Sequence, residues 1–211
     1  MRKWLAPLLI VASIAFTAAV YPELPDRVAT HFGLNGPNGW SPRALAAGFL
    51  PAITIVVWGI LLIAPKIDPR GANYAQFAET YENLILIIVG ALVVLHVLML
   101  GYALGWPISI TRLIPVVIGA MIVGIGTLLP NAKSNWFFGI RTPWTLASDR
   151  VWDRTHRVGG WLMVAAGLLI AMIGIASSDA WVWFLIATSF ALLLSPVVYS
   201  YFAWREEREH G

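Results

Sequence analysis

Residues 84–102 read LILIIVGALVVLHVLMLGY, a run with no lysine, arginine, aspartate or glutamate. The hydrocarbon core of a bilayer is about 30 Å thick, and a helix needs about 20 apolar residues to cross it. A helix on the surface of a soluble domain keeps one polar face, whereas this run is apolar on every side. We therefore predict that it crosses a membrane as an α-helix.

Other stretches of the chain share this character. They are residues 4–20, 44–64, 113–129, 161–176 and 180–201. Only 12% of the 211 residues are charged, against about 25% in an ordinary soluble domain. A chain of this length cannot bury six apolar helices in a core of its own. We predict an all-α, polytopic membrane protein with six transmembrane helices. The absence of cysteine excludes disulfides, thiolate nucleophiles and iron–sulfur sites.

The distribution of lysine and arginine predicts the orientation. If the N-terminus is cytoplasmic and all six segments span, the cytoplasmic parts carry eleven of these residues and the external loops carry three. Cytoplasmic loops are enriched in positive charge. We therefore expect both termini in the cytoplasm, and we read the basic pI as a record of orientation and not of nucleic-acid binding.

The predicted spans divide the chain into four parts. Residues 1–64 hold the first two spans and an external loop (21–43), residues 65–130 hold spans three and four, residues 131–160 form a cytoplasmic amphipathic motif, and residues 161–211 hold spans five and six with a charged tail. A long loop follows the first span of each three-helix half. This layout is compatible with the inverted repeats of transporters.

The cytoplasmic motif is polar and aromatic, unlike the rest of the chain. Thr142 and Pro143 are typical of a helix N-cap and first helical position, and Ser148 is a second possible start. Beyond it, Val151 and Thr155 share an apolar face, and arginines at 150, 154 and 157 share another. We predict an amphipathic helix that lies parallel to, or tucked against, the cytoplasmic membrane surface.

The roles of several charged and polar residues near the membrane can be predicted from the sequence, in some cases with alternatives. Arg141 either takes part in a buried hydrogen-bond network or binds an anionic group; the alternative is that it is a surface charge. Glu79 and Glu82 precede the third span, and with Asn135 and Arg141 they would form one cytoplasmic polar cluster. His96 lies deep in the third span, where an ionisable group is costly. It either bonds two helices together or serves a function such as proton relay.

The external loop contains the turn-forming pairs Asn-Gly and Gly-Pro, and we expect a compact, ordered loop. Its His31, Asn35, Asn38 and Trp40 are candidates to contact an extracellular ligand such as a peptide. His31 has the alternative role of satisfying the backbone of the loop. Zinc needs three or four converging ligands, and we predict no metal site and no cofactor.

The polar segments also resemble a known family. Residues 135–161 are similar to the signature of the SdpI family of bacterial multi-pass membrane proteins, at Asn135, Gly139, Arg141, Thr142, Pro143, Trp152, His156 and Arg157. The external loop resembles the uncharacterised domain that often precedes it in such proteins, at Leu24, Pro25, His31, Gly33, Gly36, Asn38 and Trp40. The two matches together span nearly the whole chain.

The resemblance implies immunity and signalling in a bacterial cytoplasmic (inner) membrane. The founding member protects its producer from a secreted killing peptide and holds a winged-helix repressor at the membrane. The expected partners are therefore the lipid bilayer, an extracellular peptide toxin and such a repressor, with no direct contact to nucleic acid. The chain has none of the common nucleophile or metal-hydrolase motifs, so we expect no enzyme. The alternative is a transporter of small molecules, peptides or lipids built from two inverted halves.

Overall fold

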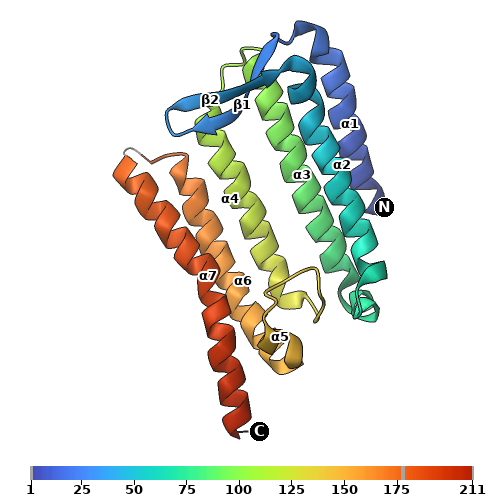
Figure 1. Ribbon diagram of the computed structural model, residues 1–211, viewed down its shortest axis with the longest axis vertical. Helices are drawn as coiled ribbons and strands as arrows, with labels where there is room; N and C mark the ends of the chain where they lie inside the picture. Colours follow the sequence, from blue (N-terminus) through green and yellow to red (C-terminus); the bar gives the residue numbers. More distant parts are fainter. Residues whose placement is uncertain (1, 177–178, 211) are drawn as a thin grey trace.

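The computed structural model describes residues 2–176 and 179–210, which form a bundle of long helices with a β-hairpin at one end (Figure 1). Within this described part, six helices are long and apolar enough to cross a membrane. They are α1 (Leu5–Val20), α2 (Arg43–Ile67), α3 (Ala78–Ala103), α4 (Ile110–Leu128), α6 (Asp149–Ile173) and α7 (Asp179–His210). The predicted fold class and the six spans are confirmed.

Shorter elements join the spans. The connections contain η1 (Arg2–Trp4), η2 (Tyr21–Glu23), β1 (Arg27–Gly33), β2 (Gly36–Pro42), η3 (Gly71–Phe77), η4 (Leu129–Asn131) and α5 (Pro143–Ala147). The strands lie at one end of the bundle, which we call the hairpin end. The turn with η3, the segment with α5 and the C-terminus lie at the other, which we call the cap end (Figure 1).

The spans form two three-helix groups. In the first, α3 packs against α1 and α2, and in the second, α6 packs against α4 and α7. Contacts between α3 and α4 join the groups. The α4–α6 pair is the closest, because glycines at 119 and 126 of α4 lie against the backbone of α6 at Gly167 and Gly160. Small residues of this kind let membrane helices approach closely.

The predicted external loop is a two-stranded antiparallel hairpin. Its register pairs Ala29 with Trp40 and Phe32 with Pro37, with irregularities on either side of His31. Val28 is fully buried against the bundle. The sequence predicted order in this loop but not strands, because β2 reads GPNGWSP and glycine, proline and asparagine are depleted in strands.

The amphipathic motif differs from its prediction. Residues 149–160 are the first turns of α6 and continue into the span without a break, so they do not form a helix lying along the membrane surface. The Gly159–Gly160 pair does not end the helix, because both glycines are buried where α6 meets other elements. Gly159 lies beside Pro196 of α7, and Gly160 beside Pro130 of η4.

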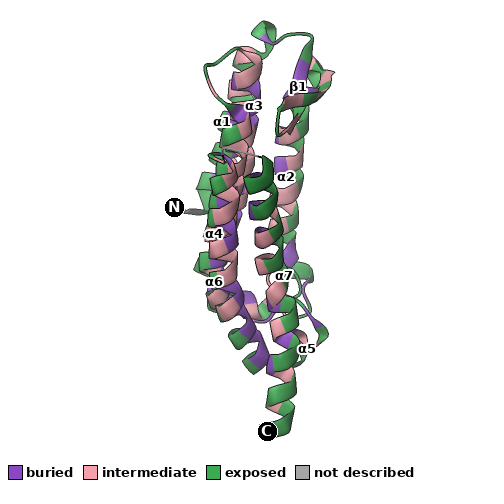
Figure 2. Ribbon diagram, turned by 90° about the vertical axis from the view of Figure 1, so that its left-hand side faces the viewer, coloured by how far each residue is buried: buried purple, intermediate pink, exposed green. Residues whose placement is uncertain are grey.

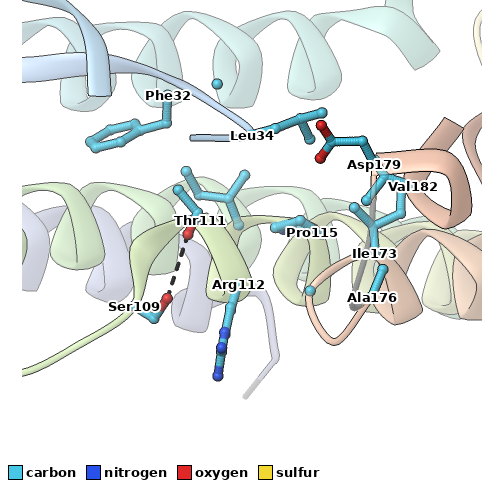
Figure 3. A pocket seen from close by; sticks show the side chains of 13 residues that line it. Phe32, Leu34, Ser109, Thr111, Arg112, Pro115, Ile173, Ala176, Asp179 and Val182 are labelled. Carbon is cyan, nitrogen blue, oxygen red and sulfur yellow. Dashed lines mark hydrogen bonds between the residues drawn. The ribbon is translucent and has the colours of Figure 1, made fainter. Parts of the chain in front are cut away.

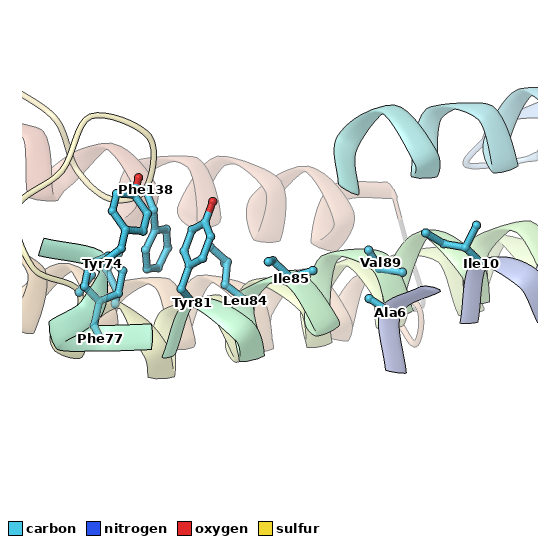
Figure 4. Packing of buried hydrophobic residues seen from close by; sticks show 11 residues of the cluster. Ala6, Ile10, Tyr74, Phe77, Tyr81, Leu84, Ile85, Val89 and Phe138 are labelled. Carbon is cyan, nitrogen blue, oxygen red and sulfur yellow. The ribbon is translucent and has the colours of Figure 1, made fainter. Parts of the chain in front are cut away.

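The core of the first helix group extends into the cap end. Tyr74 and Phe77 each pack edge to face on Tyr81 near the start of α3, and Phe138 joins them from the loop after α4 (Figure 4). Buried residues gather along the lower part of α6, while the last turns of α7 are largely exposed (Figure 2). The cap end is therefore packed as a protein core and is more than a set of loops.

Candidate functional site

Two connecting segments fold together at the cap end. We call residues 68–77, between α2 and α3, and residues 131–148, between α4 and α6, the cap. It contains most of the motif residues predicted from sequence, and His156 and Trp152 reach it from α6. Because its two segments come from different helix groups, any bond between them ties the two groups together.

Asn135 is the centre of the cap and has no exposed surface. Its side-chain oxygen accepts hydrogen bonds from the backbone N–H groups of Phe137 (2.9 Å) and Phe138 (2.6 Å) and from the hydroxyl of Tyr74 (3.3 Å). Its amide nitrogen donates to the carbonyls of Lys133 (2.8 Å) and Phe138 (2.9 Å). An amide has both donors and acceptors, and this one uses all of them to hold a tight turn.

Asp68 is the buried acid of the cap. One carboxylate oxygen accepts from the backbone N–H of Arg70 (2.7 Å), and the other accepts from the Tyr74 hydroxyl (3.0 Å) and the Trp136 N–H (2.8 Å). Arg70 donates in turn to the Ser134 hydroxyl and to the Leu146 carbonyl. Hydrogen bonds to a charged group are stronger than those between neutral groups. These bonds join the segment after α2 to the segment after α4.

His156 supports the cap from α6. Its Nε2 accepts from the backbone N–H of Ile140 (2.9 Å), so its Nδ1 carries the proton and donates to the carbonyl of Trp152 (2.8 Å). The ring stacks on Trp152 with centroids 3.9 Å apart, and the indole N–H of Trp152 donates to the carbonyl of Ala132. Both ring nitrogens of His156 are therefore occupied by the protein's own groups.

Gly139 is required by this contact. Its φ of +124° is a conformation that L side chains rarely adopt. A Cβ at this position would also overlap Nε2 of His156. The Gly-x-Arg turn of the motif thus has a steric reason, which is to let the chain pass directly over the imidazole.

The predicted helix starts are confirmed. Thr142 caps α5 through a reciprocal capping box with Thr145, and Pro143 follows at the first helical position. Ser148 caps α6 by accepting from the Val151 N–H (3.3 Å). The Thr142 hydroxyl also lies 3.1 Å from that of Ser200, which links the cap to α7.

The exposed rim of the cap carries cations and aromatic rings. Arg141 is exposed, and its guanidinium donates to the carbonyl of Trp136. Trp136 and Phe137 are themselves exposed. The arginines of α6 also face outward at 150, 154 and 157, and Arg154 pairs with Glu206 of α7 at 2.7 Å.

The acid next to Asn135 is Asp68, and not Glu79 or Glu82 as the sequence predicted. Glu79 and Glu82 are exposed at the start of α3, and the carboxylate that shares the Tyr74 hydroxyl with Asn135 is that of Asp68. Sequence reasoning missed Asp68, although an aspartate before Pro69 at the end of a span is a turn signal. No local pattern predicts the bonds of Arg70 to the second segment, because Ser134 and Leu146 are far away in sequence.

His96 lies at the interface of α1 and α3. Its Nε2 is 2.7 Å from the hydroxyl of Thr17, and only 1% of the residue is exposed. Side chains of this kind bond helices together inside a membrane. The contact supports the reading of His96 as a bond between helices.

The four ligand candidates of the external loop all lie on the hairpin. Nδ1 of His31 bonds to the side-chain oxygen of Asn38 across the strands. The bond joins the two strands through side chains, and a role of His31 in satisfying the backbone of the loop stays a prediction. Asn35 lies at the exposed turn, and Trp40 is 50% exposed. Within the described residues, no group of three or more histidine, aspartate and glutamate side chains is placed to hold a metal.

Fold and site together define a six-span membrane protein whose two helix groups are tied by a buried polar cap. Residues 131–200 match the SdpI/YfhL protein family, and residues 8–55 match a domain of unknown function, DUF1648. The chain is 22% identical over 207 residues to the Immunity protein SdpI of Bacillus subtilis (strain 168), covering 98% of each chain. No solved structure matches it. The chain carries a region of the SdpI/YfhL family at residues 131–200 and is a multi-pass protein of a bacterial cell membrane.

Proposed function

We propose that this protein is a membrane immunity protein that protects its cell from a secreted killing peptide. The observation that carries the proposal is the similarity to Immunity protein SdpI over 98% of both chains, from the hairpin to the cap. Inside the cap, the buried acid and imidazole bond to the protein's own backbone and side chains. This use of Asp68 and His156 favours recognition over catalysis.

The orientation gives the two ends different roles. The cap end carries Lys66, Arg70, Lys133, Arg141 and the α6 arginines, and the hairpin end carries only Arg27, Arg43 and Arg112 in the described residues. The positive-inside rule then puts the cap and both termini in the cytoplasm and the hairpin outside, where a secreted peptide arrives. The exposed arginines of the cap face the cytoplasm.

A signalling role follows from the same surface. Arg141 and the three arginines of α6 form an exposed basic rim that suits a cytoplasmic partner with acidic groups, such as a winged-helix regulator. A ligand at the hairpin would alter this rim only by favouring one packing of the two helix groups. The bond of His96 to Thr17 weakens one support for transport, and the inverted-repeat layout stays a prediction.

Arg141→Ala tests the role of the rim. Cells of a sensitive bacterium that express the wild type are expected to survive a secreted membrane-active peptide better than cells with an empty vector. Arg141→Ala should abolish the protection without lowering membrane abundance, because Arg141 is exposed and water replaces its bond to Trp136.

The matched control is Lys66→Ala, which removes an exposed cation at the same end of the molecule but outside the rim. Protection should survive this change. Full protection by Arg141→Ala at wild-type abundance would contradict a role for the rim, and no protection by the wild type would contradict the immunity function.

A further inference from the structure

A cavity of about 540 Å³ lies at the hairpin end, between the tip of the hairpin and the second helix group. The tip of the hairpin, at Phe32 and Leu34, forms one wall, and the start of α4 and the facing ends of α6 and α7 form the others (Figure 3). Its volume is within the range of about 300–1,000 Å³ that is typical of ligand sites.

The hairpin reaches this cavity from the opposite helix group. Val28 of β1 is buried, and Phe32 packs edge to face on Tyr102 of α3 with centroids 5.5 Å apart. The hairpin is thus held by the first group through Val28 and Phe32, while its turn beyond Phe32 faces the second (Figure 1). A molecule in the cavity would contact both the hairpin domain and the helices that follow the cap.

The lining combines apolar side chains with the hydroxyl groups of Ser109 and Thr111 and with two charged residues. Phe32, Leu34, Ile173 and Val182 supply apolar surface. The carboxylate of Asp179, at the start of α7, is directed toward Leu34 (Figure 3). The guanidinium of Arg112 extends to the side away from the hairpin in the same view. The cavity therefore presents a negative charge beside apolar walls.

This chemistry suits a ligand with a positive charge next to apolar groups. An opposite charge on the ligand pairs with Asp179, and apolar side chains are removed from water against Phe32 and Leu34. A basic amphipathic peptide has both features within one helical turn or one strand. It would also reach the cavity from outside the cell in the orientation proposed above.

We propose that this cavity binds the basic, apolar segment of an exported amphipathic peptide. The proposal rests on the proposed immunity function and assigns its recognition site. The sequence predicted that His31 and Asn38 contact the ligand, but these side chains bond to each other. The residues proposed here are at the tip of the hairpin and the start of α7.

The charge is tested by binding to the full-length protein in phosphatidylcholine nanodiscs. The probe is a fluorescently labelled amphipathic peptide of leucine and lysine, and its anisotropy reports binding above that of empty nanodiscs. Asp179→Asn is expected to weaken binding about fivefold, the effect of losing one partly exposed ion pair. Asp26→Asn is the matched control, because it removes a 96% exposed carboxylate at the same end. Equal affinity of wild type and Asp179→Asn would overturn the proposal.

The location is tested by cysteine protection, since the natural chain has no cysteine. The probe peptide should slow the reaction of Leu34→Cys with a membrane-impermeant maleimide several-fold and leave Glu23→Cys unaffected. Glu23 is exposed at the same end but does not line the cavity. Equal rates with and without peptide at Leu34→Cys would overturn the proposal. Protection by phosphatidylethanolamine without peptide would do so too, because the cavity would then hold a lipid headgroup.

The binding measurements and the survival assay can refute the cavity proposal and the immunity function separately. A wild type that protects cells while the peptide leaves Leu34→Cys reactive refutes the cavity and keeps the immunity function. A wild type that binds the peptide at Leu34 without protecting cells refutes the immunity function and keeps the cavity.

Discussion

Asn135→Ala is expected to lower the free energy of unfolding by roughly 3–5 kcal/mol. The substitution leaves the N–H groups of Phe137 and Phe138 and the Phe138 carbonyl without their partner in a site that has no exposure. Each buried polar group that loses its partner costs about 1–3 kcal/mol. Alanine replaces none of these bonds, so the turn that carries the motif should open and release the contact between the two helix groups.

The measurement is the apparent melting temperature of the purified protein in detergent, followed by size-exclusion chromatography after heating. Asn131→Ala is the control, because Asn131 is an exposed asparagine a few residues away. Asn135→Ala should melt well below the wild type, and Asn131→Ala should melt with it. Equal melting of all three proteins would show that the cap does not hold the bundle together.

Gly119→Ala is expected to destabilise the protein by about 2–3 kcal/mol through steric overlap between α4 and α6. The added Cβ would overlap the carbonyl oxygen of Gly167 and lie 2.7 Å from the backbone nitrogen of Ala171. Neither atom is at the end of a flexible side chain, so the two helix axes must move apart. Overpacking of this kind costs about 1–3 kcal/mol, and the movement also loosens the closest packing in the bundle.

Gly90→Ala provides the matched control within another span. A Cβ at Gly90 of α3 meets no atom within 4 Å. Alanine there should be neutral or stabilising by up to about 1 kcal/mol, because glycine weakens helices. Melting in detergent should therefore fall for Gly119→Ala and hold or rise for Gly90→Ala. The same fall for both variants would contradict the packing explanation, because a methyl group that meets no atom at Gly90 would then cost as much as one that overlaps α6.

The transmembrane helices were predictable because a bilayer imposes one simple requirement on composition and length. Runs such as residues 84–102 satisfy it without reference to the rest of the chain. The continuation of α6 through Gly159 and Gly160 was not predictable, because it depends on Pro196, Pro130 and the cap filling the space beside the glycines. The hairpin was missed for a similar reason: Val28 is buried by the bundle although β2 has little strand propensity of its own.

The cap was predictable in outline and not in its bonding. Local signals gave the helix starts at Thr142 and Ser148, which depend on residues nearby in sequence. The partners of Asn135 include Tyr74, 61 positions away, and those of Asp68 include Trp136, 68 positions away. Such pairs form because α2 and α4 end side by side, and no local sequence pattern predicts that arrangement. The chemistry of Arg141 was open in the sequence, and the structure puts it on the exposed rim.

Both proposals depend on one orientation of the molecule, with the hairpin outside the cell and the cap in the cytoplasm. Single cysteines at Asn35, on the exposed hairpin turn, and at Ala147, at the exposed end of α5, test it in a chain without other cysteines. With a membrane-impermeant maleimide on intact cells, Asn35→Cys should react and Ala147→Cys should react only after permeabilisation. Reaction of Ala147→Cys in intact cells, with Asn35→Cys protected, would contradict this orientation.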